Sequence, residues 1–183
     1  MGIELSEEQV AAYHRDGFLL LRRFYDLERD VLPIQHAIGR IIQIVREQNG
    51  LGPESSADPA AFDIGFASLI EHNRALGGVV YDAVKQIPAF VRLVASSAHE
   101  AVYRQLLGTE IVGIAGGGYG IRIDNPNEER FRADWHQEYP AQLRSVDGAV
   151  FWSPLVPMEE SMGPVRICVG SHVEGLIPVY AQD

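Results

Sequence analysis

Hydrophobic positions recur with two different periods along the chain, one helical and one typical of strands. Near the start, Ser6 and Gln9 form a capping box that predicts a short helix ending at about Arg15. After Pro33, apolar residues at helical spacing predict a longer helix with one buried face: Ile34, Ile38, Ile41, Ile42 and Val45. With further helices expected before Gly108, residues 1–108 are predicted to be mainly helical.

After Gly108 the period changes to two, so residues 109–183 are predicted to be mainly strand. Strand candidates are 111–123, 132–139, 148–156 and 165–169, together with an earlier apolar run at 18–24. Helices followed by antiparallel strands indicate an α+β chain, a single domain over residues 1–183. The expected architecture is N-terminal helices packed on a double-stranded β-helix, or jelly roll. Trp135, Val150, Trp152 and Val165 are expected in its sandwich core.

Residues 51–60 contain Gly, Pro, Ser and Asp without any periodicity. This composition is typical of a surface loop, and a plain connector is the simpler interpretation. In an enzyme the same loop could act as a lid over the site, so both interpretations stay open at this point.

Composition narrows the choice of partner and compartment. The formal net charge of −10 argues against nucleic acid and against an anionic membrane, because both attract clustered Lys and Arg. A small-molecule substrate fits this charge better. Cys168 is the single cysteine, so no disulfide forms within the chain, and the first residues lack the features of a signal peptide. The expected location is the cytoplasm.

One short motif carries candidate metal chemistry. His136 and Glu138 are two residues apart in a predicted strand, where residues at this spacing share a face. An imidazole and a carboxylate, joined by a second imidazole, form the facial triad that leaves positions on iron(II) open. The alternative without a function is a pair of half-exposed strand residues, since a triplet as short as His-x-Glu often occurs by chance.

Several motifs in order resemble those of the phytanoyl-CoA dioxygenase family, whose members are iron(II)- and 2-oxoglutarate-dependent oxygenases. The matching segments are 5–9, 16–18, 135–138, 148–155, 162–166 and 170–172. The resemblance implies that His136 and Glu138 are the first two iron ligands and that Trp152 lines the 2-oxoglutarate pocket. It places Arg122 on the strand entering the site. The implied reaction uses Fe(II), 2-oxoglutarate and O2 to oxidise an unactivated carbon of a small organic substrate.

The sequence departs from the family pattern in two ways. Glu138 stands where the family usually has Asp, which moves the carboxylate one methylene further from the backbone. The family's distal histidine and its basic anchor for 2-oxoglutarate follow the Gly-Ser-His segment, whereas this chain ends 11 residues after His172. His172 is therefore a candidate third ligand, although the family places this histidine in a turn.

These departures predict an incomplete site in a jelly roll that lacks its last strands. A further C-terminal segment, a partner or a second copy of the chain would then cover the open sheet. The alternative function is a non-catalytic family relative that acts as a small-molecule binding or structural domain.

Two other kinds of site are disfavoured by the residues. A zinc deaminase also uses His-x-Glu, but it needs a downstream pair of cysteines, and the chain contains one cysteine. The glycines at 116–118 and 120 lack the spacing of a nucleotide-binding loop and precede a predicted strand, so they are expected to permit a bend.

Overall fold

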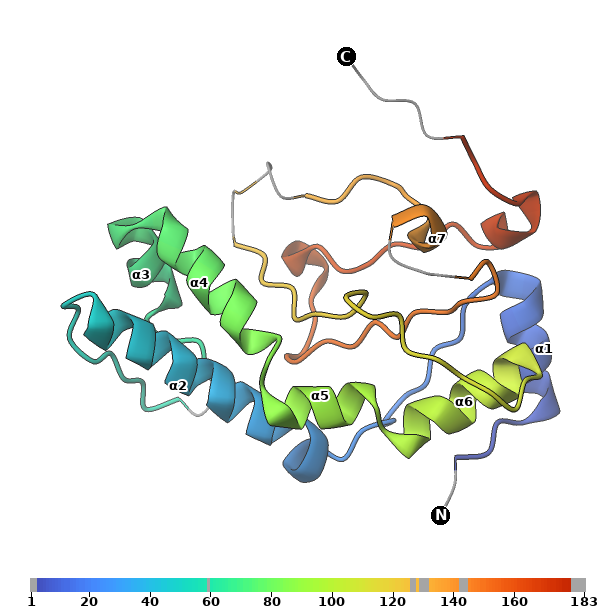
Figure 1. Ribbon diagram of the computed structural model, residues 1–183, viewed down its shortest axis with the longest axis horizontal. Coiled ribbons are helices and arrows are strands. Elements are labelled where there is room, and N and C mark those ends of the chain that lie inside the picture. Colours follow the sequence, from blue (N-terminus) through green and yellow to red (C-terminus); the bar gives the residue numbers. More distant parts are fainter. Residues whose placement is uncertain (1–2, 59, 126–127, 129–131, 142–144, 179–183) are drawn as a thin grey trace. The chain divides into compact units, whose positions relative to one another are not determined.

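Helices form the regular secondary structure of the residues that the structure describes, which are 3–58, 60–125, 128, 132–141 and 145–178. The structure is a computed structural model (Figure 1). The chain divides into two compact units. Unit 1 comprises Met1–Phe24, Ser96–Gly118 and Asp134–Asp183, and unit 2 comprises Tyr25–Ala95 and Tyr119–Ala133.

The jelly-roll prediction is wrong, because no strand or sheet occurs anywhere in the described residues. The five segments expected to be strands are irregular or, at Glu138–Ala141, helical. Backbone hydrogen bonds in this part of the chain include local turns, such as Gly118 N–H to Ala115 O and Gly148 N–H to Ser145 O. Alternating side chains show which residues could share a face, but a sheet also requires a second backbone to complete the hydrogen-bond ladder.

Unit 2 is a helical assembly built around one long helix. Its elements are η1 (Leu27–Val31), α2 (Leu32–Gln48), α3 (Phe66–His72), α4 (Arg74–Val84) and α5 (Pro88–Val94). Helix α2 contacts η1, α4 and α5, and α3 packs against α4 (Figure 1). Within the described residues, every helix is too short or too polar to cross a lipid bilayer.

The apolar face predicted for α2 is confirmed. Four of its expected residues are buried: Ile34, Ile38, Ile42 and Val45. Helices α3 and α4 also carry buried apolar residues, which include Leu69 of α3 and Val80 and Val84 of α4, and α4 packs against α2. Burial of branched aliphatic side chains of this size stabilises a core by roughly 1.5–3 kcal/mol each.

Unit 1 pairs two helices, α1 (Glu7–Asp16) and α6 (Ser97–Leu107), which pack against each other (Figure 1). The capping box predicted at Ser6 is confirmed, since its hydroxyl accepts from Gln9 N–H and the Gln9 side chain accepts from Ser6 N–H. The unit also contains α7 (Glu138–Ala141), η3 (Glu160–Met162) and η4 (Ser171–Glu174).

The residues expected in a sandwich core are exposed instead. Relative exposure is 63% for Trp135, 51% for Val150, 50% for Trp152 and 50% for Val165. Phe151, between two of them, packs against the core cluster of unit 1. The inward-facing position in this segment is therefore one residue away from the predicted one, as expected when no sheet sets the register.

Phe151 joins an aromatic stack on α6. The buried His99 ring lies 4.1 Å from the Phe151 centroid and is also stacked on Phe24 at 5.6 Å. Tyr103, one turn further along α6, donates its hydroxyl to Ala149 O at 2.7 Å. These contacts hold the irregular segment before Trp152 against the helix. Phe151 is therefore held in place, and the adjacent Trp152 is exposed.

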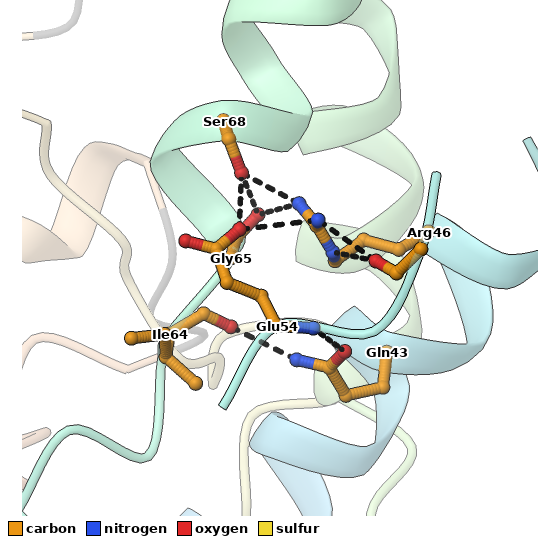
Figure 2. Close-up of polar contacts among 7 residues, drawn as sticks. Gln43, Arg46, Glu54, Ile64, Gly65 and Ser68 are labelled. Atoms are coloured by element: carbon orange, nitrogen blue, oxygen red, sulfur yellow. Dashed lines mark hydrogen bonds and ion pairs between the residues drawn. The ribbon is translucent and has the colours of Figure 1, made fainter. Parts of the chain in front are cut away.

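A buried arginine organises the loop after α2, as Figure 2 shows. The Arg46 guanidinium donates to Gly52 O at 2.9 Å and to Gly65 O at 3.0 Å. It also donates to Ser68 Oγ at 2.5 Å and lies 3.1 Å from the Glu54 carboxylate. Ser68 in turn donates its hydroxyl to Glu54 at 2.7 Å. One side chain thus contacts four residues of the loop and of α3 with its preceding residue: Gly52, Glu54, Gly65 and Ser68.

Gln43, one turn earlier on α2, also hydrogen-bonds to this part of the chain. Its amide donates to Ile64 O at 3.1 Å and accepts from Glu54 N–H at 3.2 Å (Figure 2). The loop that leaves α2 is therefore tied to that helix at both ends. The contacts at Gly52 and Glu54 fit the interpretation of residues 51–60 as a connector, and the lid stays a prediction.

Replacing Arg46 with Met should lower the free energy of unfolding by about 2–4 kcal/mol, because the carbonyl groups of Gly52 and Gly65 lose their donors. The matched control is Arg40→Met on the same helix, whose exposed pair with Glu47 spans 3.5 Å. It should change stability by less than about 0.5 kcal/mol. Urea denaturation measures both, and equal effects would show that the buried network does not hold the loop.

Candidate functional site

The structure brings the two predicted metal ligands together. His136 Nε2 lies 3.4 Å from Glu138 Oε1, with the side chains 48% and 34% exposed. Glu138 begins helix α7, so the chain turns between the two residues and does not continue as a strand. The proximity therefore comes from this local turn and from the length of the glutamate side chain.

The contact of the other ring nitrogen of His136, Nδ1, indicates the tautomer of the imidazole. Nδ1 lies 2.6 Å from Asp134 O, and a carbonyl oxygen can only accept, so Nδ1 carries a proton. In the neutral imidazole, Nε2 is then an unprotonated acceptor directed at a second acceptor, Glu138 Oε1. Such a pair is stabilised by a cation, either a proton on Nε2 or a bound metal ion.

Glu138 shows a second sign of an unsatisfied site. Its Oε2 atom is buried and has no hydrogen-bond partner among the described residues. A buried carboxylate oxygen without a donor is costly in free energy, and native proteins satisfy nearly all such atoms. A metal ion bound through both carboxylate oxygens would supply the missing interaction.

The donor atoms fit a divalent metal of the first transition row. Imidazole nitrogen and carboxylate oxygen bind such ions at about 2.0–2.2 Å, so two adjacent ligands lie about 3.0–3.4 Å apart. The separation in the structure, 3.4 Å, is at the upper end of that range. The Nδ1–H group of His136 also donates a hydrogen bond to a backbone carbonyl, which is the usual arrangement for a metal-binding histidine.

No third ligand accompanies the pair, since the described residues contain no group of three His, Cys, Asp or Glu side chains that could hold a metal ion. His172, the candidate for this position, is engaged elsewhere in unit 1. Its Nε2 donates to His14 O at 2.9 Å, and its ring covers Gly17 so closely that an added Cβ there would lie 2.5 Å from Nδ1.

His172 belongs to a turn that closes the C-terminal end of α1. Gly170 N–H donates to Asp16 O at 2.8 Å, and Gly17 N–H donates to Tyr13 O at 2.8 Å. The hydrogen bond from Arg15, assisted by the charge of His172, holds the pKa of the Asp16 carboxyl below its ordinary value. The Gly-Ser-His motif therefore satisfies backbone carbonyls that a helix end leaves open.

The two predicted cofactor-binding residues lie in different units. Trp152 is in unit 1, with its indole half exposed. Arg122 is in unit 2, where its Nε lies 2.7 Å from both carboxylate oxygens of Asp124. The strand expected around Arg122 is absent from the described residues, so that part of the prediction is wrong. Their roles in binding 2-oxoglutarate stay predictions.

Sequence reasoning missed Gln137, the residue between the two candidate ligands. Its amide hydrogen-bonds to the backbone at Gly175 and Ile177. Nothing in the local pattern identifies this contact, because the partners are 38 and 40 residues away and lie in no regular element.

Comparisons of the chain with protein-family models, with curated proteins and with solved structures find no match. The family resemblance therefore depends on the sequence motifs alone.

Replacement of Gly17 with Ala tests how His172 is used. Gly17 and Gly108 both end helices of unit 1 with positive φ, at 81° and 60°, but only Gly17 is covered by another side chain. Gly108→Ala should destabilise by about 1–2 kcal/mol through the backbone alone. Gly17→Ala should be more destabilising, because His172 must also move.

The excess effect at Gly17 should disappear when His172 is replaced by Ala, as a double-mutant cycle in thermal unfolding would show. If Gly17→Ala and Gly108→Ala are equally destabilising in the native background, His172 does not pack on α1.

Proposed function

We propose that this chain functions as an iron(II)- and 2-oxoglutarate-dependent dioxygenase that oxidises an unactivated carbon of a small organic substrate. The observation that carries the proposal is the His136–Glu138 pair, in which an imidazole nitrogen faces a carboxylate with one buried, unpartnered oxygen. The order of the sequence motifs supports the same function. His136 and Glu138 are assigned as two of the iron ligands.

Each site residue has a distinct task in this proposal. The Asp134 carbonyl holds His136 in the tautomer in which Nδ1 carries the proton and Nε2 faces Glu138, whose carboxylate would neutralise part of the metal charge. Trp152 offers an exposed aromatic face against which the cosubstrate can pack and exclude water. Arg122 lies in the other unit, where it is paired with Asp124, so its part in binding 2-oxoglutarate stays a prediction from the sequence motifs. Iron(II) held by His136 and Glu138 would supply the activation of O2 that accompanies oxidative decarboxylation of 2-oxoglutarate.

The remaining ligand and the cover of the site are proposed to come from outside the described residues. Exposed apolar side chains are frequent in the last part of unit 1 and include Val146, Val150, Val165, Ile167 and Val169. A second copy of the chain is the proposed partner that would bury them. The proposed partner is otherwise a small molecule, since the net charge of −10 suits neither nucleic acid nor an anionic membrane, and the proposed location is the cytoplasm.

Metal binding tests the proposal directly, with Mn(II) as a redox-stable substitute for Fe(II). We expect the native chain to bind one Mn(II) ion and Glu138→Ala to bind it more than about tenfold more weakly, because even residues behind the ligands affect affinity by about 10–100-fold. Glu138→Asp should retain part of the affinity, since it keeps the carboxylate. Glu100→Ala, on exposed α6 surface, is the matched control and should bind like the native chain.

The cosubstrate separates a dioxygenase from a simple metal binder. By thermodynamic linkage, 2-oxoglutarate should tighten Mn(II) binding, whereas succinate, which lacks the 2-oxo group, should not. Equal effects of both acids would favour a non-catalytic binding domain. Failure of the native chain to bind Mn(II) would overturn the proposed function.

A further inference from the structure

Gln137 clamps a distant backbone segment beside the candidate metal pair. Its Oε1 accepts from Ile177 N–H at 2.8 Å, and its Nε2 donates to Gly175 O at 2.7 Å. A side-chain amide has one accepting and one donating side, so it can satisfy two backbone groups of an extended segment as a neighbouring strand would.

The same clamp occurs a second time in unit 1. Gln105 Oε1 accepts from Leu5 N–H at 2.8 Å, and its Nε2 donates to Ile3 O at 2.9 Å. In both cases the amide takes the carbonyl of one residue and the N–H of the residue two positions later. The two clamps are alike in chemistry, but only Gln137 lies between the candidate ligands.

The segment that carries the metal pair needs such support. Residues 134–137 are in no strand or helix, so no regular hydrogen-bond ladder fixes their direction. Their contacts instead come from side chains on both sides of His136. Trp135 lies under the Arg166 guanidinium at 5.1 Å from its ring, and Gln137 holds the segment around Ile177. A rotation of the backbone at Gln137 would move Glu138 away from His136.

The backbone at Gly175 is shaped to complete this contact. Its φ of 73° and ψ of −156° lie in a region that is essentially restricted to glycine. An added Cβ would meet no atom within 4 Å, so a side chain at this position is opposed by the backbone conformation alone. Gly175 therefore allows the clamp to be perturbed from its distant side, without any change next to the metal pair.

We infer that Gln137 is a positioning residue, which sets the geometry of the His136–Glu138 pair by binding the backbone of residues 175–177. The inference rests on the proposed function, because it assigns the clamp to the affinity of that metal site. It also makes residues 175–177 part of the site's support, although they contribute no ligand.

The test compares Mn(II) affinity and amide hydrogen exchange in Gln137→Ala and in the control Gln105→Ala. Each variant should lose exchange protection at its own clamped amide, Ile177 N–H or Leu5 N–H. Only Gln137→Ala should weaken Mn(II) binding, by about 10–100-fold, as expected for a residue that orients a ligand. Gln105→Ala should stay within about twofold of the native affinity.

Two further measurements separate positioning from a merely structural role. Gly175→Ala should weaken Mn(II) binding, as Gln137→Ala does. The double variant should bind Mn(II) as tightly as the single variant with the lower affinity, because both substitutions break the same contact. In the native protein, Mn(II) should increase protection of Ile177 N–H and leave that of Leu5 N–H unchanged, by reciprocal coupling.

The outcomes distinguish the two proposals. If the native chain binds Mn(II) but Gln137→Ala and Gln105→Ala bind it equally well, the positioning role is overturned and the proposed function stands. If the native chain binds no Mn(II), both are overturned. If the affinity falls only in Gln137→Ala, and Mn(II) protects Ile177 N–H, the positioning role is supported.

Discussion

Hydrogen bonds from side chains to the backbone of irregular segments are the interaction on which this structure depends. Without a sheet in the described residues, long stretches of peptide lack a regular ladder. Arg46 serves this purpose for the loop after α2, Tyr103 for the segment before Phe151, and His172 for the end of α1. Because unpaired buried backbone groups are costly in free energy, the hydrogen bonds from Arg46 and Tyr103 help to decide where the segments that they contact lie.

Local features of the sequence predicted the helices well. The capping box at Ser6 and the apolar face of α2 both follow from residues three to four positions apart within one helix. The buried Arg46 could not be read from the same pattern. It lies next to Val45 on the edge of the apolar face, and its burial depends on carbonyls from a loop and on Ser68 of another helix.

The strand predictions failed for a physical reason that can be seen at residues 150–152. Val150, Phe151 and Trp152 are consecutive apolar residues, so in a strand either face could be the buried one. Only pairing with a second strand would fix which face is buried. In the structure Phe151 is held by His99 and Tyr103 of α6, so the other two residues are exposed. A helix supplied the packing surface that the predicted sheet was expected to provide.

The candidate site combines what the sequence predicted with what it could not. The spacing of His136 and Glu138 suggested proximity through a strand, yet they meet because the chain turns into α7 between them. A strand would project both side chains in parallel from a rigid ladder, whereas a turn leaves their separation free to change. The longer glutamate can span such a turn, and its position must then be fixed from elsewhere. Gln137, the residue between the two candidate ligands, can fix that position because its side chain is hydrogen-bonded to a segment about 40 residues later.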